Sequence, residues 1–370
     1  PILPMMIHDG VITLSFGSTL ASLNYLGYLI GALMCMWLPS HWSSAALVRW
    51  GLLLTAILTL GMVLDNYYIW LVLRFLAGMI SAIVLVHTSR WCLALLITKG
   101  RISLGSMMFT GVGLMITLSG LMVSGMIQLG WSSTSGWICF GMMALVLTVL
   151  IWHIFQTKEP PPPQISSSQS IIKSASHSTN TGEMSLFSFA YGLAGFGYII
   201  TATFLPIIAR TILPPSDLIW ADLFWPAFGL SAVIGSISVS YFDWFKDPRI
   251  ALVICYLLEA TGVVGAIFIP TIAGFFISSL LAGLPFNVIN FYTMREVTRL
   301  RPLHAARYMG LLTALFSIGQ IVGPPLVNVL LKAAHTQAQG FSWSLQIAAL
   351  ALVIGAGIFG FLAFKWPIRA

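Results

Sequence analysis

One charged side chain lies inside an apolar stretch. Arg74 falls within residues 68–86, a run long and apolar enough to cross a membrane. A charge at membrane depth costs several kcal/mol unless it faces protein or water, so such a residue marks a functional site by default. We therefore interpret Arg74 as a cation that faces a polar cavity, where it attracts an anionic group or acts on a proton-binding partner. The alternative is a structural arginine bonded to carbonyl groups at helix ends.

Uncharged polar side chains recur in the other apolar stretches at helical spacing. Residues three, four or seven positions apart lie on one face of a helix. Such side chains can hydrogen-bond a solute, whereas the alternative is a bond between helices, a common use of Asn and Gln in membranes. The candidates for a solute pathway are Asn24 with Tyr28, Tyr191 with Tyr198, Asn287 with Asn290, and Gln320 among glycines.

Two carboxylates are candidates for carrying a coupling proton, because Asp and Glu side chains within membranes form proton relays. Glu259 lies well within an apolar stretch, and Asp222 lies near the end of another. The alternatives are a structural glutamate that is neutral or paired, and an aspartate at the membrane interface. Together with Arg74, these residues form the set of possible proton-coupling groups.

The sequence shows no pattern of an enzyme or of a metal centre. Cys35, Cys92, Cys139 and Cys255 have no CxxC spacing and fall in or near separate apolar stretches, which indicates packing residues. The seven histidines are scattered, with no pair at ligand spacing. Because no nucleophile–base set and no ATP-binding motif is present either, we expect no catalytic residues, no metal and no cofactor.

The composition predicts an all-α polytopic membrane protein. Of its 370 residues, 58% are hydrophobic and 7% are charged, against about 25% charged in soluble domains; the mean hydropathy is +0.95. Apolar runs of about 20 residues recur, and in lipid these must be helices. Eleven spans are predicted, at residues 14–38, 45–64, 68–88, 103–128, 136–156, 186–210, 220–242, 249–269, 271–293, 304–331 and 341–364.

The net charge of +7 is explained by orientation rather than by nucleic-acid binding. Of the 17 Lys and Arg residues, fourteen fall in the C-terminus and in or near the loops on one side of the predicted spans. Only Arg210 and Lys332 fall on the other side, and Arg74 lies between. This asymmetry predicts that the basic side, with the C-terminus and residues 157–185, is cytoplasmic.

Two halves of the chain are related by a constant offset. Leu76-Ala77-Gly78 and Leu281-Ala282-Gly283 lie 205 residues apart (281 − 76), and Gly31 and Gly235 lie 204 apart (235 − 31). Such a period indicates a duplicated unit. We predict an N-terminal helical bundle at 1–156, a Pro- and Ser-rich cytoplasmic linker at 157–185 and a C-terminal helical bundle at 186–370.

The same repeat predicts a helix before Pro1. Leu3-Pro4 matches Leu205-Pro206, which closes a predicted helix that begins near residue 186. We therefore expect roughly 17 or more residues of a first helix to precede this chain, which would give twelve spans. The alternative is a genuine eleven-span protein.

Several local sequences resemble the major facilitator superfamily. Arg74 to Gly78 is similar to its fourth-helix motif, and Gly319 to Pro324 is similar to its GxxxGP element. Two longer segments, Asn24 to Ala32 and Gly195 to Pro206, resemble the YbfB/YjiJ-type branch of that superfamily. The resemblance covers essentially the whole chain. The resemblance implies two pseudo-symmetric six-helix bundles with the solute path between them, and it places the helix of Glu259 outside that path.

The first hypothesis is a secondary active transporter, or permease, of the bacterial inner membrane. It would move an unassigned small solute by alternating access, and proton coupling follows by analogy with the superfamily. Alternatives are a solute sensor with the transporter fold and, third, a membrane enzyme. The expected partners are the solute and membrane lipid, with no nucleic acid, and the expected state is a monomer.

Overall fold

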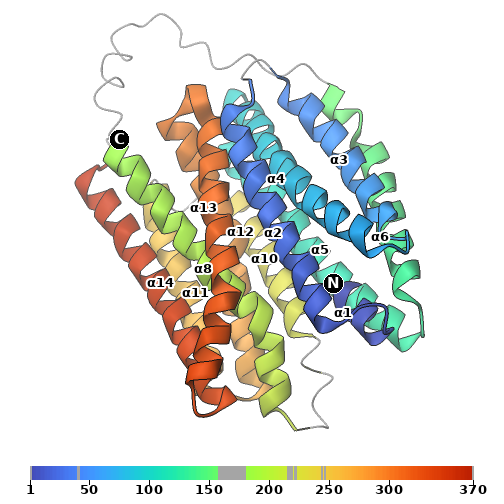
Figure 1. Ribbon diagram of the computed structural model, residues 1–370. Helices are drawn as coiled ribbons and strands as arrows, with labels where there is room; N and C mark the ends of the chain where they lie inside the picture. Colours follow the sequence, from blue (N-terminus) through green and yellow to red (C-terminus); the bar gives the residue numbers. More distant parts are fainter. Residues whose placement is uncertain are drawn as a thin grey trace, which may run out of the picture.

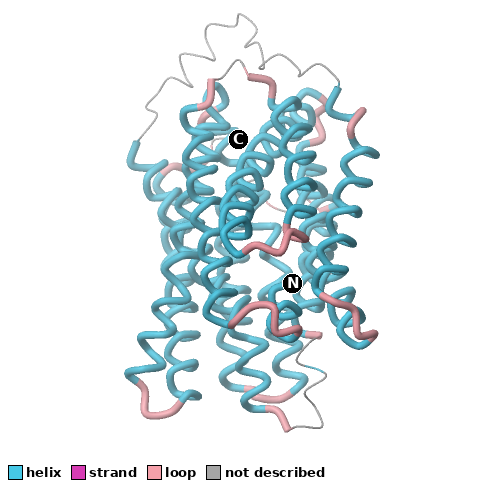
Figure 2. The backbone as a smooth tube through the Cα atoms, turned by 45° about the vertical axis from the view of Figure 1, so that its right-hand side comes forward, coloured by secondary structure: helices cyan, strands magenta, loops and turns pink. Residues whose placement is uncertain are grey.

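The computed structural model describes residues 2–39, 42–156, 181–214, 220, 223–242, 245 and 247–368. Within these ranges every regular element is a helix, and eleven helical segments are long and apolar enough to span a membrane, as predicted. Figure 2 shows the helices as a bundle of nearly aligned rods joined by short loops. The long helices are α2 (Leu14–Trp37), α3 (Ser44–Gly61), α4 (Tyr67–Thr98), α5 (Met107–Gln128), α6 (Ser133–Ile151), α8 (Thr181–Ile212), α10 (Phe224–Tyr241), α11 (Pro248–Phe268), α12 (Ile272–Leu300), α13 (Ala305–Ala333) and α14 (Gln337–Lys365). Two short elements, α1 (Ile2–His8) and η1 (Ile102–Ser106), complete the part of the chain that positions the site.

Three helices extend beyond the predicted spans at the same end of the bundle. The helix α4 continues to Thr98, α12 continues to Leu300, and α8 begins at Thr181. The predictions ended at 88 and 293 and began at 186, because the charged residues Arg90, Arg295 and Glu183 interrupt the apolar runs there. The backbone hydrogen bonds of a helix continue past that point, so apolar patterning underestimates helix length at the membrane surface.

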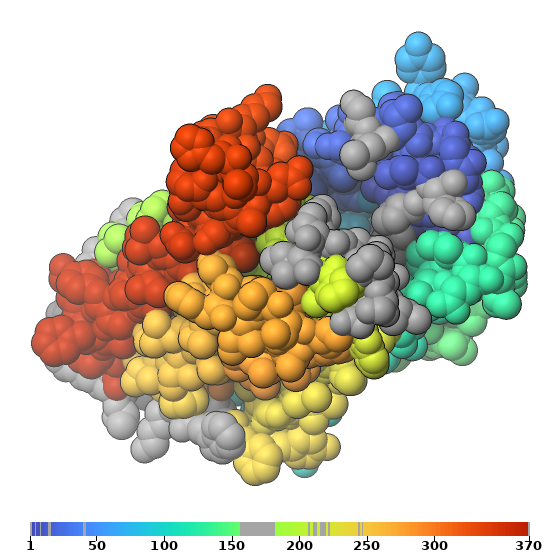
Figure 3. All heavy atoms as spheres, turned by 90° about the horizontal axis from the view of Figure 1, so that it is seen from below, coloured from blue at the N-terminus to red at the C-terminus, as the bar shows by residue number. Residues whose placement is uncertain are grey.

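The chain forms two bundles that follow its two halves. In Figures 1 and 3, α2 to α6 lie on one side of the molecule and α8 to α14 on the other. Within the halves, α2 packs on α4 as α10 packs on α12, and α3 packs on α4 as α11 packs on α12. Between the halves, α5 packs on α10 and α2 packs on α13. These are the pairings that a duplicated unit requires.

Glycines allow the same close helix approach in both halves. A Cβ added at Gly31 would overlap the backbone carbonyl of Met79, and one added at Gly235 would overlap that of Leu284. These four positions correspond under the offset of 204 or 205 residues, so α2–α4 and α10–α12 cross in the same way. The repeated glycines in the sequence are therefore explained by helix contact.

The end of the bundle where α2 and α4 finish and α3 and α11 begin carries Arg49, Lys99, Arg249 and Lys365, and we call it the basic end. The two halves meet there across η1 and α10. The Ser106 hydroxyl donates to the backbone carbonyl of Ser236 and lies 2.9 Å from the Ser240 Oγ atom. Residues of both halves thus close this end of the bundle near α5 and α10.

A buried ion cluster holds the second half together at the basic end. Arg249 has no exposed surface. Its guanidinium donates to Asp247 at 2.9 and 3.0 Å and to Glu183 at 3.1 Å. It also donates to the backbone carbonyls of Leu362 and Trp366. One side chain therefore joins α8, α11 and α14.

Candidate functional site

A cavity of about 330 Å³ lies between the two halves, midway along the helices. Both bundles contribute to its wall, through α2, α4 and α5 of the first half and α8, α12 and α13 of the second. The size is at the lower end of the range for small-molecule sites, which is roughly 300–1,000 Å³. Its lining residues are Asn24, Tyr25, Tyr28, Ser81, Leu85, Phe109, Val112, Tyr191, Tyr198, Phe286, Asn287, Asn290, Thr313, Phe316 and Gln320.

The structure brings most of the predicted pathway residues together in this cavity. Four helices that are far apart in the sequence supply them, and each presents the face that the spacing indicated. The seven that line the wall are Asn24, Tyr28, Tyr191, Tyr198, Asn287, Asn290 and Gln320. Their convergence places them where a solute can meet them, while their individual roles remain predictions.

Arg74 does not line the cavity itself but contacts Asn24, a residue that does. Its Nη2 atom donates a hydrogen bond to the Oδ1 atom of Asn24, which lines the cavity. Its Nε atom is buried and has no hydrogen-bond partner among the described residues, and no described carboxylate forms an ion pair with the guanidinium. Among the described residues, the guanidinium is thus bonded to a neutral amide on the cavity wall, and its functional role stays a prediction.

Asn290 and Tyr191 hold each other in place. The Tyr191 hydroxyl of α8 donates to the Asn290 Oδ1 atom of α12, and the Asn290 Nδ2 atom donates to the Phe286 carbonyl at 2.9 Å. These bonds use the amide oxygen and one amide hydrogen of Asn290. The pair therefore fixes the wall between α8 and α12.

Asn287 connects the cavity wall to the contact between the halves. Its side chain is 1% exposed, and its Nδ2 atom donates to the Phe109 carbonyl of α5 at 2.8 Å and to the Ala232 carbonyl of α10 at 3.2 Å. Because both carbonyls accept hydrogen bonds, the NH2 group of the Asn287 side chain, and not its oxygen, must face them. Its Oδ1 atom is buried without a partner among the described residues.

Aromatic rings that the sequence did not single out form much of the cavity wall. Tyr198 stacks on Phe286 with ring centroids 4.4 Å apart, and Tyr191 lies 5.0 Å from Phe316. Three of these rings belong to Phe109, Phe286 and Phe316, which lie in apolar runs. In such a run, the sequence does not distinguish an aromatic residue that faces a cavity from one that packs in the core. Tyr25, Ser81 and Thr313 were also not predicted, although Tyr25 adjoins Asn24 in the sequence.

Of the two candidate proton-coupling carboxylates, the structure describes one. Glu259 is 2% exposed on α11 and is not among the cavity-lining residues, as the helix order of the resembled family implied. Asp222 lies outside the described residues. A further buried carboxylate, Glu296, was not predicted; it pairs with Arg299 at 2.6 Å on the part of α12 beyond the predicted span.

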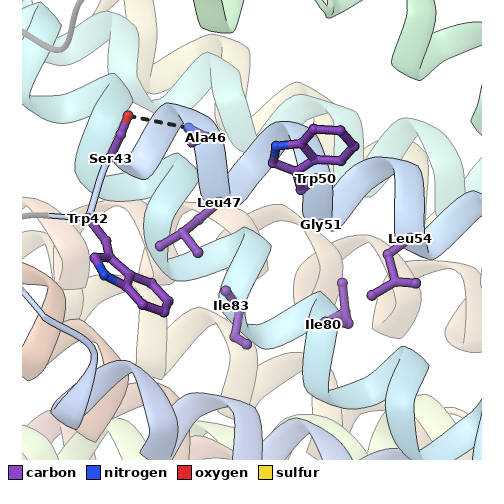
Figure 4. Close-up of a pocket in the computed structure, with 9 residues that line it drawn as sticks. All are labelled: Trp42, Ser43, Ala46, Leu47, Trp50, Gly51, Leu54, Ile80 and Ile83. Carbon is purple, nitrogen blue, oxygen red and sulfur yellow. Dashed lines mark hydrogen bonds between the residues drawn. The ribbon is translucent and has the colours of Figure 1, made fainter.

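A second hollow lies between α3 and α4 (Figure 4) and differs in chemistry. It is lined by apolar side chains such as Trp42, Trp50 and Ile80. Its one side-chain hydroxyl, that of Ser43, accepts a hydrogen bond from the Ala46 backbone N–H at 3.3 Å as the helix N-cap. Apart from this capping hydroxyl, the polar groups of the lining side chains are the indole N–H groups of Trp42 and Trp50, whereas the cavity between the halves carries polar groups from several helices, so that cavity is the candidate site.

Comparisons with known proteins agree with this architecture. A family model described as an uncharacterised MFS-type transporter, YbfB, matches residues 1–359. A search of curated proteins finds no match. A variant of the E. coli fucose:proton symporter FucP has the same fold, with a TM-score of 0.68 at 16% identity over 97% of this chain and 93% of that one. FucP in the outward conformation gives a TM-score of 0.67 at 15% identity over 97% and 96% of the two chains.

Proposed function

The chain belongs to the YbfB-type family of major facilitator transporters, and from that premise we propose that it moves a small solute across the bacterial inner membrane by alternating access, coupled to protons. It is a multi-pass membrane protein with the fold of secondary transporters. The observation that carries the proposal is the cavity between the two halves, with polar groups from both. A site at the interface of repeats, near mid-membrane, is where such transporters bind their solutes.

The contacts between the halves support rocking around this cavity. The α5–α10 contact includes Gly113 and Gly229, where an added Cβ would lie 2.7 Å from the opposite backbone. The α2–α13 contact includes Gly310, where it would lie 2.7 Å from the Ala32 carbonyl. Small residues at both contacts let the helix backbones approach closely, which suits a rocking motion in which one end closes while the other opens.

The positions of the charged residues are the basis for the proposed orientation in the membrane and for the proposed proton-coupling groups. The basic end, the C-terminus and the linker 157–185 face the cytoplasm. Arg74 acts on the cavity through Asn24, and Arg74, Glu259 and Asp222 remain the proposed proton-coupling groups. The N-terminal bundle at 1–156 and the C-terminal bundle at 186–370 are the two moving bodies, in a monomer whose partners are the solute and membrane lipid.

Counterflow in proteoliposomes tests transport without knowledge of the coupling ion. Vesicles that contain the purified full chain are preloaded with individual metabolites, and entry of the same labelled metabolite is followed. We expect at least one metabolite to exchange, and Gln320→Leu to slow its exchange. The matched control is Gln346→Leu on α14, where the glutamine bonds only Ser342 on the outer surface. Binding of a metabolite without exchange would indicate a sensor and contradict the proposal.

A further inference from the structure

The cavity wall carries no charge among the residues that the structure describes. None of the lining side chains is Asp, Glu, Lys, Arg or His. The nearest guanidinium, that of Arg74, is bonded to Asn24 and lies behind it. A full charge on a solute would lose its hydration in this cavity without a direct partner of opposite sign, which is unfavourable. The wall therefore favours an uncharged solute.

The polar groups that remain open to the cavity are hydroxyls and a carboxamide. Tyr28, Tyr198 and Gln320 are partly exposed, and their side-chain polar atoms form no hydrogen bond with other described residues. By contrast, Tyr191 and Asn290 already bond each other. Phenolic hydroxyls and carboxamides can both donate and accept, so they are best matched by a solute whose groups also do both. Hydroxyl groups have this property.

The rings beside these groups give the cavity an aromatic wall. The Tyr198 ring lies 4.4 Å from the Phe286 ring at an interplanar angle of 26°, and 6.2 Å from the Phe316 ring at 28°. The face of an aromatic ring carries partial negative charge, so it attracts the weakly positive C–H groups of a saturated ring. A saturated ring with hydroxyl groups at its edge satisfies the aromatic wall and the open polar groups at once.

We propose that the site takes a single uncharged, polyhydroxylated ring, such as a monosaccharide or a cyclic polyol. This inference rests on the proposed transport function and adds the class of the solute. One C–H face packs on the aromatic wall formed by Tyr198, Phe286 and Phe316, and the hydroxyl edge bonds Tyr28, Tyr198 and Gln320. The cavity volume of about 330 Å³ suits one ring.

Probes of matched ring and size, one neutral and one charged, test this directly. Galactose and glucose are compared with galacturonate and glucuronate, in which a carboxylate replaces the CH2OH group, together with a panel of other aldohexoses, pentoses and inositol. Binding to the purified full chain is measured by isothermal titration calorimetry. We expect at least one neutral ring to bind, and a uronate to bind about tenfold or more weakly than its neutral counterpart because its charge finds no partner in the cavity.

Two tyrosine variants show where a bound ring sits. Tyr198→Phe removes one open hydroxyl and keeps the aromatic wall, so the Kd of the neutral ring should rise by roughly three- to tenfold. The control, Tyr241→Phe, removes the hydroxyl of a residue that is 70% exposed on α10 outside the cavity, and should leave the Kd unchanged. An unchanged Kd in Tyr198→Phe would overturn the placement.

Two further results would overturn the class of solute. One is tighter binding of a uronate than of its neutral partner, with loss of that binding in Arg74→Gln. The other is no binding of any neutral ring at about 10 mM, the limit of weak affinity. Failure of the transport function is distinguished by counterflow. A neutral ring that binds but does not exchange contradicts transport and supports the inferred class of solute. Exchange of an unrelated solute, without binding of a neutral ring, supports transport and contradicts the inferred class.

Discussion

The two halves use the same backbone packing and different side-chain chemistry at matching positions. At the basic end of the second half, Arg249 and Glu296 belong to a buried ion cluster. Under the offset of 204 that relates the N-caps Ser43 and Asp247, Ala45 stands in place of Arg249, and under the offset of 205 Trp91 stands in place of Glu296. Ala45 and Trp91 pack with Val48 and Phe155 in an apolar cluster. The duplicated fold therefore tolerates either solution.

The halves also differ at the cavity. The first half has Arg74 bonded to Asn24, whereas the matching residues of the second half are Ser279 and Phe228. Ser279 is buried and donates to the Phe275 carbonyl of its own helix. The glycine contacts are retained and the polar pair is not, which indicates that the packing is a property of the repeat and that this polar pair is specific to the first half.

The largest expected effect breaks the ion cluster. Arg249→Met leaves the carboxylates of Asp247, Glu183 and Glu296 without their buried partner, so the folded protein should lose roughly 3–5 kcal/mol of stability. Thermal unfolding of the purified protein in detergent measures this. Arg299→Gln is the comparison, because Arg299 is 43% exposed and contacts only Glu296 of the cluster. Equal losses in the two variants would contradict a central role for Arg249.

Substituting the matching glycines tests whether packing is truly common to the halves. In Gly31→Ala and in Gly235→Ala, the new methyl group overlaps a backbone carbonyl of the facing helix. Each variant should lose a similar amount of stability, about 1–3 kcal/mol. Gly357→Ala on α14 is the control, since nothing lies within 4 Å of its added Cβ. A loss confined to one half would show that the close approach is required only there.

Replacing the polar pair tests the asymmetry of the cavity. Arg74→Gln removes a charged hydrogen bond to Asn24, and transport or solute affinity should fall roughly ten- to a hundredfold. Ser279→Ala, at the matching position, should have little effect on transport. Both are compared in counterflow at equal amounts of protein in the membrane. Similar defects in both variants would mean that the position supports the fold and not recognition.

Sequence patterns predicted the fold better than the site. The apolar runs gave the number of spans, and the offset of Gly31 and Gly235 indicated a duplicated unit, because both depend on backbone geometry. The spacing of Asn287 and Asn290 gave their common face. It did not give their partners: Asn290 bonds Tyr191 in the cavity wall, while Asn287 bonds carbonyls at the contact between the halves.

Other features of the site have no recognisable pattern in the sequence. Phe316 lines the cavity among apolar neighbours, and hydropathy does not distinguish it from a core residue. The position of Arg74 behind Asn24 depends on side-chain rotamers across two helices. Glu296 and Arg249 are joined only by the fold, since 47 residues separate them (296 − 249).

The most direct test of the cavity between the halves is thiol accessibility in membrane vesicles. The native cysteines are replaced, and Gln320→Cys is treated with a small, membrane-impermeant thiol reagent from each side. Gln320→Cys should react from at least one side, because water reaches a solute path. Leu350→Cys, on the exposed apolar surface of α14, should stay unmodified in lipid. A Gln320→Cys thiol that is inert from both sides would contradict a water-filled cavity between the halves.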